Sequence, residues 1–198
     1  MSGLYVASLF YLMLPIIAAG VCNMVYVKLP VHGALRAPMD GGRVLKDGRR
    51  LFGDNKTWKG FLGMIVFSSF WFSLQAALFI ALPWARRLSL VSFVSLPWPF
   101  LPPLCGGLWG LGYVLFELPN SFMKRRLGIK PGTNLRGPRG ILFSVIDQAD
   151  SVVGCFAALY AFYRYDLLTG LFLLVIGVAV HYAVNVGLYF ARLKKQAA

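Results

Sequence analysis

Five long apolar runs dominate the sequence, and polar and charged residues collect in the stretches between them. The runs cover Leu4–Val27, Gly60–Trp84, Pro103–Leu118, Ile141–Phe162 and Leu167–Phe190. Most of them approach the roughly 20 residues that a helix needs to cross the hydrocarbon of a bilayer. The pattern therefore predicts an all-α integral membrane protein with five transmembrane helices, formed by a single domain over residues 1–198.

The third run is the shortest of the five and has an unusual beginning. Four prolines stand at or just before its start, namely Pro97, Pro99, Pro102 and Pro103. They predict an irregular entry, which could include a re-entrant piece. Within the run, Gly106 and Gly110 have the small-xxx-small spacing that permits close contact between helices. A four-helix protein, in which one terminus changes sides, is the alternative.

The basic residues predict the orientation of these helices. Composition fits a membrane protein, because 58% of the residues are hydrophobic and only 14% are charged. Seventeen of the twenty Lys and Arg lie in the loops at about 28–59 and 119–140 or in the C-terminal tail, and the other side has only Arg86, Arg87 and Arg164. Since Lys and Arg collect on the cytoplasmic side, we predict a multi-pass protein of the cell membrane with its N-terminus outside and its C-terminus in the cytoplasm.

The formal net charge of +13 does not indicate a nucleic-acid-binding protein. The positive residues lie between the spans rather than on one face of a soluble domain. Membrane orientation and attraction to anionic lipid head groups explain their number. The three cysteines lie in apolar runs without the close spacing of metal or redox sites, so we interpret them as packing residues.

The first predicted cytoplasmic loop combines glycines with acidic and basic residues. Its run 39–60 contains Gly41, Gly42, Gly48 and Gly53 before the second span. Glycines permit positive φ and close approach to a ligand, and Arg and Lys supply donors for phosphate oxygens. We interpret the segment as a phosphate-binding loop, although not a P-loop, because two residues separate the last of these glycines from Lys56. A turn-rich connector is the alternative.

Two acids stand inside the fourth apolar run. Asp147 and Asp150 are three positions apart and therefore share one face of a helix. Ionised carboxylates in hydrocarbon are costly, so they are kept where a cation, a cavity or a ligand compensates them. The basic segment Lys124–Arg126 opens on the same side, so metal and phosphate ligands could meet there. The alternatives are that this segment only anchors a span and that the acids pair with Arg139 or with basic residues on another span.

Three ordered motifs resemble those of the CDP-archaeol synthase family, which belongs with the phosphatidate cytidylyltransferases. They are the run Asp47–Gly60, the run Ser121–Lys130 and the sequence Asp147-Gln-Ala-Asp150. The resemblance covers all five predicted spans. It implies an enzyme that transfers the cytidylyl group of CTP, with Mg²⁺, to a membrane lipid phosphate and releases pyrophosphate. In archaea the acceptor is 2,3-bis-O-(geranylgeranyl)-sn-glycerol 1-phosphate, and the product is a CDP-archaeol.

Two positions depart from the pattern of this family. Lys59 stands where Arg is more usual, which keeps the charge but loses the bidentate fork. Lys130 is followed by Pro131, whereas the bacterial phosphatidate enzymes have Asp at that position. One acidic ligand is therefore missing, and the first loop could replace it.

The resemblance and the chemistry of the side chains together predict the role of each site residue. Asp147 and Asp150 are predicted to hold Mg²⁺, which prefers oxygen ligands. Lys124, Arg125 and Lys130 are predicted to bind the lipid phosphate and the departing pyrophosphate. The predicted CTP-binding residues are Asp47, Arg49, Arg50, Asp54, Asn55, Lys56 and Thr57.

Other polar residues of the last two spans have predicted supporting roles. His181 and Asn185 are four positions apart and are predicted to form hydrogen bonds across helices. Gln148 and Ser151 are predicted to orient water or substrate oxygens near the acids.

Two rival functions remain open at this point. The first is the same chemistry on phosphatidate, since the shape of the apolar tails that a membrane protein accepts cannot be read from hydrophobicity. The second is a transporter of an anionic solute, because acids within spans also mark ion pathways. No inverted repeat is apparent, and five spans suit two symmetric halves poorly, although a homodimer could supply them.

Overall fold

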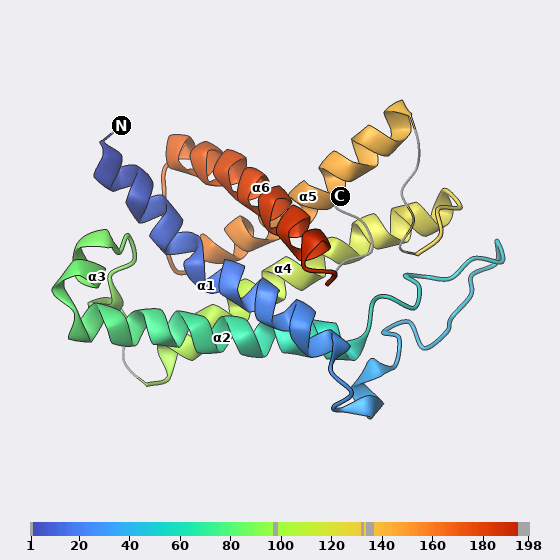
Figure 1. The fold of residues 1–198 in the computed structure, drawn as a ribbon, viewed down its shortest axis with the longest axis horizontal. Helices are drawn as coiled ribbons and strands as arrows, with labels where there is room; N and C mark the ends of the chain where they lie inside the picture. Colours follow the sequence, from blue (N-terminus) through green and yellow to red (C-terminus); the bar gives the residue numbers. More distant parts are fainter. Residues whose placement is uncertain (1, 97–98, 132, 134–136, 194–198) are drawn as a thin grey trace.

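The structure is a computed structural model that describes residues 2–96, 99–131, 133 and 137–193, without the side chains of residues 95, 138, 139 and 141. Five of its helices are long and apolar enough to cross a membrane, as predicted, and α3 is a short sixth (Figure 1). Apart from two isolated bridges, the described residues form no β-structure. The elements in chain order are α1 (Gly3–Lys28), η1 (Gly33–Arg36), α2 (Trp58–Ala81), α3 (Pro83–Leu88), η2 (Phe93–Ser95), α4 (Leu101–Arg126), α5 (Pro138–Leu159) and α6 (Leu167–Phe190).

Local sequence sets the ends of several helices. Ser2, Thr57 and Asp166 are the N-caps of α1, α2 and α6, and each side chain accepts a hydrogen bond from the backbone N–H three residues later. Each cap satisfies one N–H group that the helix itself leaves free. The second span ends at Ala81, earlier than predicted, because Pro83 begins the separate helix α3.

The third span is longer than predicted. Its first prolines lie in the first turn of α4, where a backbone N–H has no partner within the helix in any case. Pro119 lies inside α4 without ending it, and the helix continues to Arg126. Three basic residues in its last turn interact favourably with the negative end of the helix dipole. The loop between α4 and α5 therefore begins after Arg126 rather than at residue 119. The irregular entry is confirmed, since α3 and η2 occupy the preceding segment.

Helix α4 lies between α2 and α5, and small residues let the three helices approach closely. A Cβ on Gly106 would lie 2.6 Å from the carbonyl oxygen of Ser68, and one on Gly110 would lie 2.6 Å from the hydroxyl oxygen of the same serine. Gly112 of α4 and Gly154 of α5 are so close that a Cβ on either would collide with the carbonyl oxygen of the other. The predicted helix-contact role of the first two glycines is confirmed. This packing fixes the polar face of α4 beside α5.

The apolar core occupies the end of the bundle near α3 and η2. Trp109 and Phe72 are fully buried, with ring centroids 5.8 Å apart, and Phe93 of η2 packs on Phe72 at 5.0 Å. Cys105 and Cys155 are buried and free, which confirms their interpretation as packing residues, and the half-buried Cys22 is also free. The opposite half of the bundle is where polar side chains gather.

Candidate functional site

The half of the bundle away from this core encloses a cavity of about 600 Å³. A volume of this order is typical of pockets that bind a small molecule. Residues from all five long helices and from the two segments between α1 and α2 and between α4 and α5 line it. The polar lining includes Asn55, Lys56, Thr57, Glu117, Asn120, Lys124, Arg125, Lys130, Asp147 and Asp150. The cavity thus brings together residues of all three sequence motifs.

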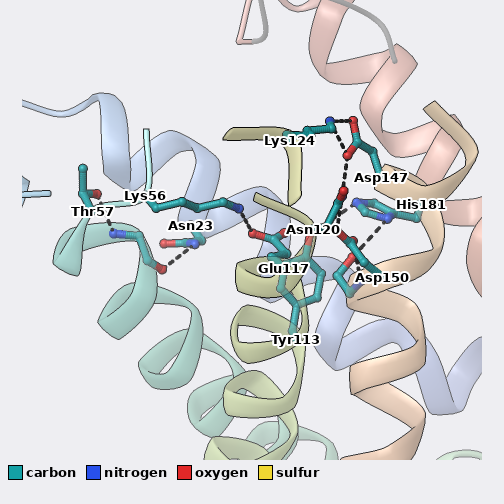
Figure 2. A network of polar contacts seen from close by, with 12 residues as sticks. Asn23, Lys56, Thr57, Tyr113, Glu117, Asn120, Lys124, Asp147, Asp150 and His181 are labelled. Atoms are coloured by element: carbon teal, nitrogen blue, oxygen red, sulfur yellow. Dashed lines mark hydrogen bonds and ion pairs between the residues drawn. The ribbon is translucent and has the colours of Figure 1, made fainter. Parts of the chain in front are cut away.

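The two acids of α5 approach a common point. Asn120 of α4 donates through Nδ2 to Asp147 Oδ1 at 2.6 Å and to Asp150 Oδ2 at 2.7 Å (Figure 2). One amide nitrogen therefore bridges both carboxylates. The prediction that the two acids share a helix face is confirmed, and both line the cavity.

Lys124, one turn beyond Asn120, donates to both carboxylate oxygens of Asp147 (Figure 2). The Lys124 and Asp147 side chains are only 14% and 28% exposed. This ion pair agrees with the alternative in which an acid pairs with a basic residue of another span, whereas the Arg139 side chain lies outside the described residues. Two carboxylates and one ammonium leave this cluster with a negative charge. The Lys124–Asp147 ion pair therefore does not by itself explain why Asp150 also lies in this span.

The donor atoms of this cluster suit a hard divalent cation. Mg²⁺ is commonly held by one or two protein carboxylates and completes its octahedron with water and substrate phosphate oxygens. The nitrogen of Asn120 shows that Asp147 and Asp150 can both reach one position. No group of three or more His, Cys, Asp and Glu side chains that could hold a metal occurs in the described part of the chain. The residues thus fit a Mg²⁺ ion shared with a phosphate-bearing substrate and not an all-protein metal cage.

The loop between α1 and α2 reaches the cavity through its last residues. Asn55, Lys56 and Thr57, three of the predicted CTP-binding residues, line it. Lys56 forms an ion pair with Glu117 of α4, and Thr57 Oγ1 accepts a hydrogen bond from the backbone N–H of Gly60 at 3.3 Å (Figure 2). The loop therefore ends at the cavity, and its last residue also begins α2.

Arg125 brings buried donor groups to the cavity. The residue is 7% exposed, and its Nε and Nη1 atoms have no hydrogen-bond partner among the described residues. A buried N–H group without an acceptor costs about 1–3 kcal/mol, more when it is charged. A guanidinium pairs well with phosphate oxygens, so the location of these donors fits an anionic ligand. Lys130, which also lines the cavity, lies on the exposed segment after α4.

Four of the predicted CTP-binding residues do not line the cavity. They are bound within the loop or to the end of α4. Arg126 donates to both carboxylate oxygens of Asp47 at 2.7 and 2.6 Å, and Arg49 donates to the carbonyl oxygen of Arg126. Arg50 forms an ion pair with Asp54 at 2.8 Å. These side chains shape the loop that carries the cavity-lining residues.

Asp40, which was not among the predicted site residues, organises this loop. Its buried carboxylate accepts hydrogen bonds from Arg50 Nη2 at 2.5 Å and from the backbone N–H groups of Phe52, Gly53 and Gly42 at 3.0, 3.0 and 3.1 Å. Burial alone would raise the pKa of Asp40. The bonds from Arg50 and from the three amides outweigh burial, so the pKa lies well below its usual range.

The two departures from the family pattern have structural explanations. Lys59 is fully buried, and its Nζ donates to the carbonyl oxygen of Leu29 at 2.7 Å, so it joins the end of α1 to the start of α2. Pro131 packs against Gly53, where an added Cβ would lie 2.7 Å from Pro131 Cγ. Gly53 also has a φ of 102°, which side chains rarely tolerate. Position 131, where the bacterial phosphatidate enzymes have Asp, is thus a contact between the segment after α4 and the loop before α2.

A second polar cluster joins α4, α5 and α6. Nδ1 of His181 lies 3.1 Å from the carbonyl oxygen of Gln148, and its Nε2 lies 3.2 Å from the hydroxyl of Tyr113. Asn185 donates to Gln148 Oε1 at 2.7 Å, and the Ser151 hydroxyl lies 3.5 Å from His181 Nδ1. The predicted hydrogen bonding across helices is confirmed. The Gln148 side chain is used in this cluster, and a role of Gln148 and Ser151 in orienting water stays a prediction.

Glu117 and Asn120 were not among the predicted site residues, although the sequence contains a signal for them. Tyr113, Glu117, Asn120 and Lys124 follow one another at intervals of four, three and four residues. Such intervals place side chains on one face of a helix. The pattern can be recognised only if the helix is assumed to continue through Pro119, whereas the predicted span ended at Leu118.

Comparison with known proteins gives a consistent family. Residues 1–197 match the family model described as CarS-like: CDP-archaeol synthase. The CDP-archaeol synthase of Pyrococcus furiosus is 33% identical over 154 residues, which cover 77% of this chain and 78% of the relative. That of Halobacterium salinarum is 33% identical over 141 residues, covering 69% and 68%. A solved structure presented as an intramembrane enzyme for archaeal membrane lipids biosynthesis has a TM-score of 0.59 and 28% identity, covering 89% of this chain and 92% of its own.

Proposed function

Because the chain belongs to the CDP-archaeol synthase family, we propose that it transfers the cytidylyl group of CTP to 2,3-bis-O-(geranylgeranyl)-sn-glycerol 1-phosphate. The products are a CDP-archaeol and pyrophosphate. The observation that carries this proposal is that two acids and several cations from three motifs line one cavity, where they meet the apolar interior of a helix bundle. The transporter alternative has no comparable support, since the matched relatives are named as synthases.

The reaction needs no protein nucleophile. An oxygen of the acceptor phosphate forms a bond to the α-phosphorus of CTP. The bond from that phosphorus to the oxygen bridging it to the β-phosphorus breaks, and pyrophosphate leaves with the electron pair. Such a transfer proceeds when the two phosphates are aligned and their charge is neutralised. The chain's task is therefore to hold two polyanions together.

The residues around the cavity divide this task. We propose that Asp147 and Asp150 hold Mg²⁺, which when bound neutralises charge on the triphosphate oxygens. Arg125 binds phosphate oxygens through its free donors, and Lys124 and Lys130 add charge for the lipid phosphate and the departing pyrophosphate. Cations that contact the reacting phosphates stabilise the charge that develops during transfer.

The nucleotide lies on the side of the cavity formed by the first loop. Asn55, Lys56 and Thr57 are the loop residues that line the cavity. The amide and hydroxyl groups suit the cytosine edge or the ribose, and the ammonium suits a phosphate. Arg50, held by Asp40 and Asp54, acts by shaping the loop.

The cavity opens toward the cytoplasm in the proposed orientation. Seventeen of the twenty Lys and Arg belong to the loops and tail on its side. CTP is a cytoplasmic substrate, so this orientation gives the nucleotide direct access. A protease site placed after Arg192 tests the orientation, because it should be cut in inside-out vesicles and protected in intact cells.

A product analysis tests the proposed function. Purified protein is incubated with CTP, Mg²⁺ and an equimolar pool of the geranylgeranyl ether phosphate and phosphatidate, and the CDP-lipids are identified by mass spectrometry. The expected product is the ether CDP-lipid, with one pyrophosphate released for each molecule formed. CDP-diacylglycerol as the main product would contradict the proposed acceptor but support the proposed cytidylyl transfer. No CDP-lipid from either acceptor would contradict both.

A further inference from the structure

The cavity has an apolar part that the reacting phosphates do not need. One face of α1 and one face of α6 line it, with residues at intervals of three or four positions. The lining residues of α1 are Met13, Ile16, Ile17, Gly20, Asn23, Met24 and Val27. Those of α6 are Gly177, Val180, His181, Val184, Asn185 and Leu188. These two helices therefore form the boundary between the cavity and the bilayer on this side.

Helices α1 and α6 are connected at both ends and separated by the cavity between them. Near their starts, the hydroxyl groups of Tyr5 and Thr169 share a hydrogen bond of 2.7 Å. Near their ends, Lys28 Nζ donates to the carbonyl oxygen of Arg192 at 3.0 Å. Figure 1 shows the two helices running in the same direction, side by side. An opening between them would thus be bounded at both ends by a hydrogen bond.

The volume of the cavity limits what it can enclose. Pockets of about 300–1,000 Å³ hold one drug-sized ligand, and CTP alone is a ligand of that size. A cavity of about 600 Å³ cannot enclose CTP and also two geranylgeranyl chains. Because those chains are continuous with the reacting phosphate, they must leave the cavity through its wall.

We propose that the two hydrocarbon chains of the acceptor lipid pass from the cavity into the bilayer between α1 and α6, across Gly20. This inference rests on the proposed function, because the lipid phosphate is the acceptor there. The opening lies between the Tyr5–Thr169 and Lys28–Arg192 hydrogen bonds, on the apolar side of the same cavity that contains the acids. Gly20 is the specificity-determining position, because it sets the width of the passage.

The surroundings of Gly20 support this assignment. No heavy atom lies within 4 Å of the position that a Cβ on Gly20 would occupy. Gly177, the glycine of α6 that also lines the cavity, is different, because a Cβ there would lie 2.8 Å from Val152 Cγ1 and 3.1 Å from the Phe156 ring. Gly177 therefore serves helix packing, whereas Gly20 leaves space. A large side chain at position 20 would occupy this space without displacing protein atoms near its Cβ.

The experiment compares Gly20→Phe with Leu14→Phe on two acceptors. Leu14 is on the same helix, is 51% exposed and does not line the cavity, so its replacement adds the same ring outside the proposed passage. The acceptors are the geranylgeranyl ether phosphate and a water-soluble analogue with short ether chains. For Gly20→Phe we expect at least a tenfold loss of kcat/KM on the long-chain acceptor and less than a threefold change on the short one. Leu14→Phe should stay within about twofold of the wild type on both.

The outcomes separate this inference from the proposed function. Equal losses on both acceptors, or no loss on either, would overturn the passage across Gly20 while the wild type still makes CDP-lipid. A wild type that makes no CDP-lipid from either acceptor would overturn the proposed function and this inference with it.

A second measurement on the wild type does not depend on the folding of a variant. A lipid phosphate with a photoreactive group midway along one chain is irradiated in vesicles, and labelled peptides are mapped with and without excess unlabelled lipid phosphate. Competable labelling is expected on residues 13–27 of α1 and 177–188 of α6. Competable labelling confined to the outer face of α2, where Val66 and Phe70 are exposed, would overturn the inference.

Discussion

The loop between α1 and α2 and the wall formed by α4 and α5 contain similar charged side chains but use them differently. In the loop, the chain supplies the partners, as when Asp40 binds Arg50 and three backbone amides. In the wall, Lys124 pairs with Asp147, but Asp150 forms no ion pair with a described residue, and Arg125 retains buried N–H groups without a partner among the described residues. Charge density alone therefore does not identify ligand-binding residues. The distinguishing property is how far the chain itself satisfies the charge.

The largest expected effect is the removal of either acid of the wall. Asp147→Asn and Asp150→Asn keep the shape of the side chain but remove a charged ligand for Mg²⁺, so turnover should fall by about 10³-fold. Pyrophosphate release at saturating CTP and Mg²⁺ measures it, and binding of Mn²⁺ in the presence of CTP, followed by electron spin resonance, should weaken in parallel.

Asp166→Asn provides a matched control for these substitutions. Asp166 caps α6, accepts a hydrogen bond from the Thr169 backbone at 2.7 Å and does not line the cavity. Because Asn caps a helix about as well as Asp, this substitution should change stability little and leave turnover nearly unchanged. Amide variants of the wall acids with turnover close to that of this control would remove the distinction between wall and loop.

The second prediction compares the effects of replacing two neighbouring arginines of α4. Arg125→Met removes buried donors that have no partner among the described residues, so we expect an activity loss of about 10²-fold with an unchanged or higher free energy of unfolding. Arg126, whose Nε is also buried without a partner among the described residues, instead donates to Asp47 and to the carbonyl oxygens of Arg49 and Arg50 in the loop. Arg126→Met removes these loop contacts and should lower activity less than threefold. Initial rates and thermal unfolding in the same detergent measure both.

A different result would contradict the role assigned to each of the two arginines. If Arg125 only supports the fold, Arg125→Met will lose stability and activity together. If Arg126 contacts substrate, its replacement will raise KM for CTP or for the lipid without changing stability. Either result would mean that the wall and the loop are not separated at this turn of α4.

The sequence was sufficient to predict the five spans and the helix face that Asp147 and Asp150 share. Apolar runs near the length of a membrane span and residues three positions apart have few structural alternatives. The end of α4 could not be predicted in the same way, because Pro119 usually indicates an interruption, although the helix needs to lose only one hydrogen bond there. Glu117 and Asn120 were therefore not recognised as members of the same face as Lys124.

The arrangement of the first loop could not be read from its composition. Glycines, arginines and aspartates predict a phosphate-binding loop and a turn-rich connector equally well. Only three-dimensional proximity shows that Asp40 lies inside the loop and that Asn55, Lys56 and Thr57 reach the cavity. The partners of Asp40 are between two and thirteen positions away, and no periodic pattern records such contacts.

The smallest of the three effects concerns the loop itself. Asp40→Asn replaces a carboxylate that accepts charged and backbone hydrogen bonds, and the loop should lose about 2–3 kcal/mol of local stability. Because the loop lies beside the substrate without supplying the reacting groups, the variant should raise KM for CTP about fivefold and change kcat less, through a smaller population of the binding-competent loop. Hydrogen exchange of residues 40–54, followed by mass spectrometry, reports the loosening directly.

The pH dependence of this variant decides whether the Asp40 charge is responsible. An aspartate in an unfolded chain has a pKa of about 3.9, and folding lowers the pKa of Asp40 below that value. Its contribution to stability is therefore complete above about pH 5 and is lost as the pH falls through the folded pKa. The difference in exchange between the wild type and Asp40→Asn should stay constant from about pH 8 to pH 5 and shrink below about pH 4. A difference that persists undiminished at the lowest pH would show that the amide disturbs the loop by its shape, and the loop's internal ion pairs would then not explain its order.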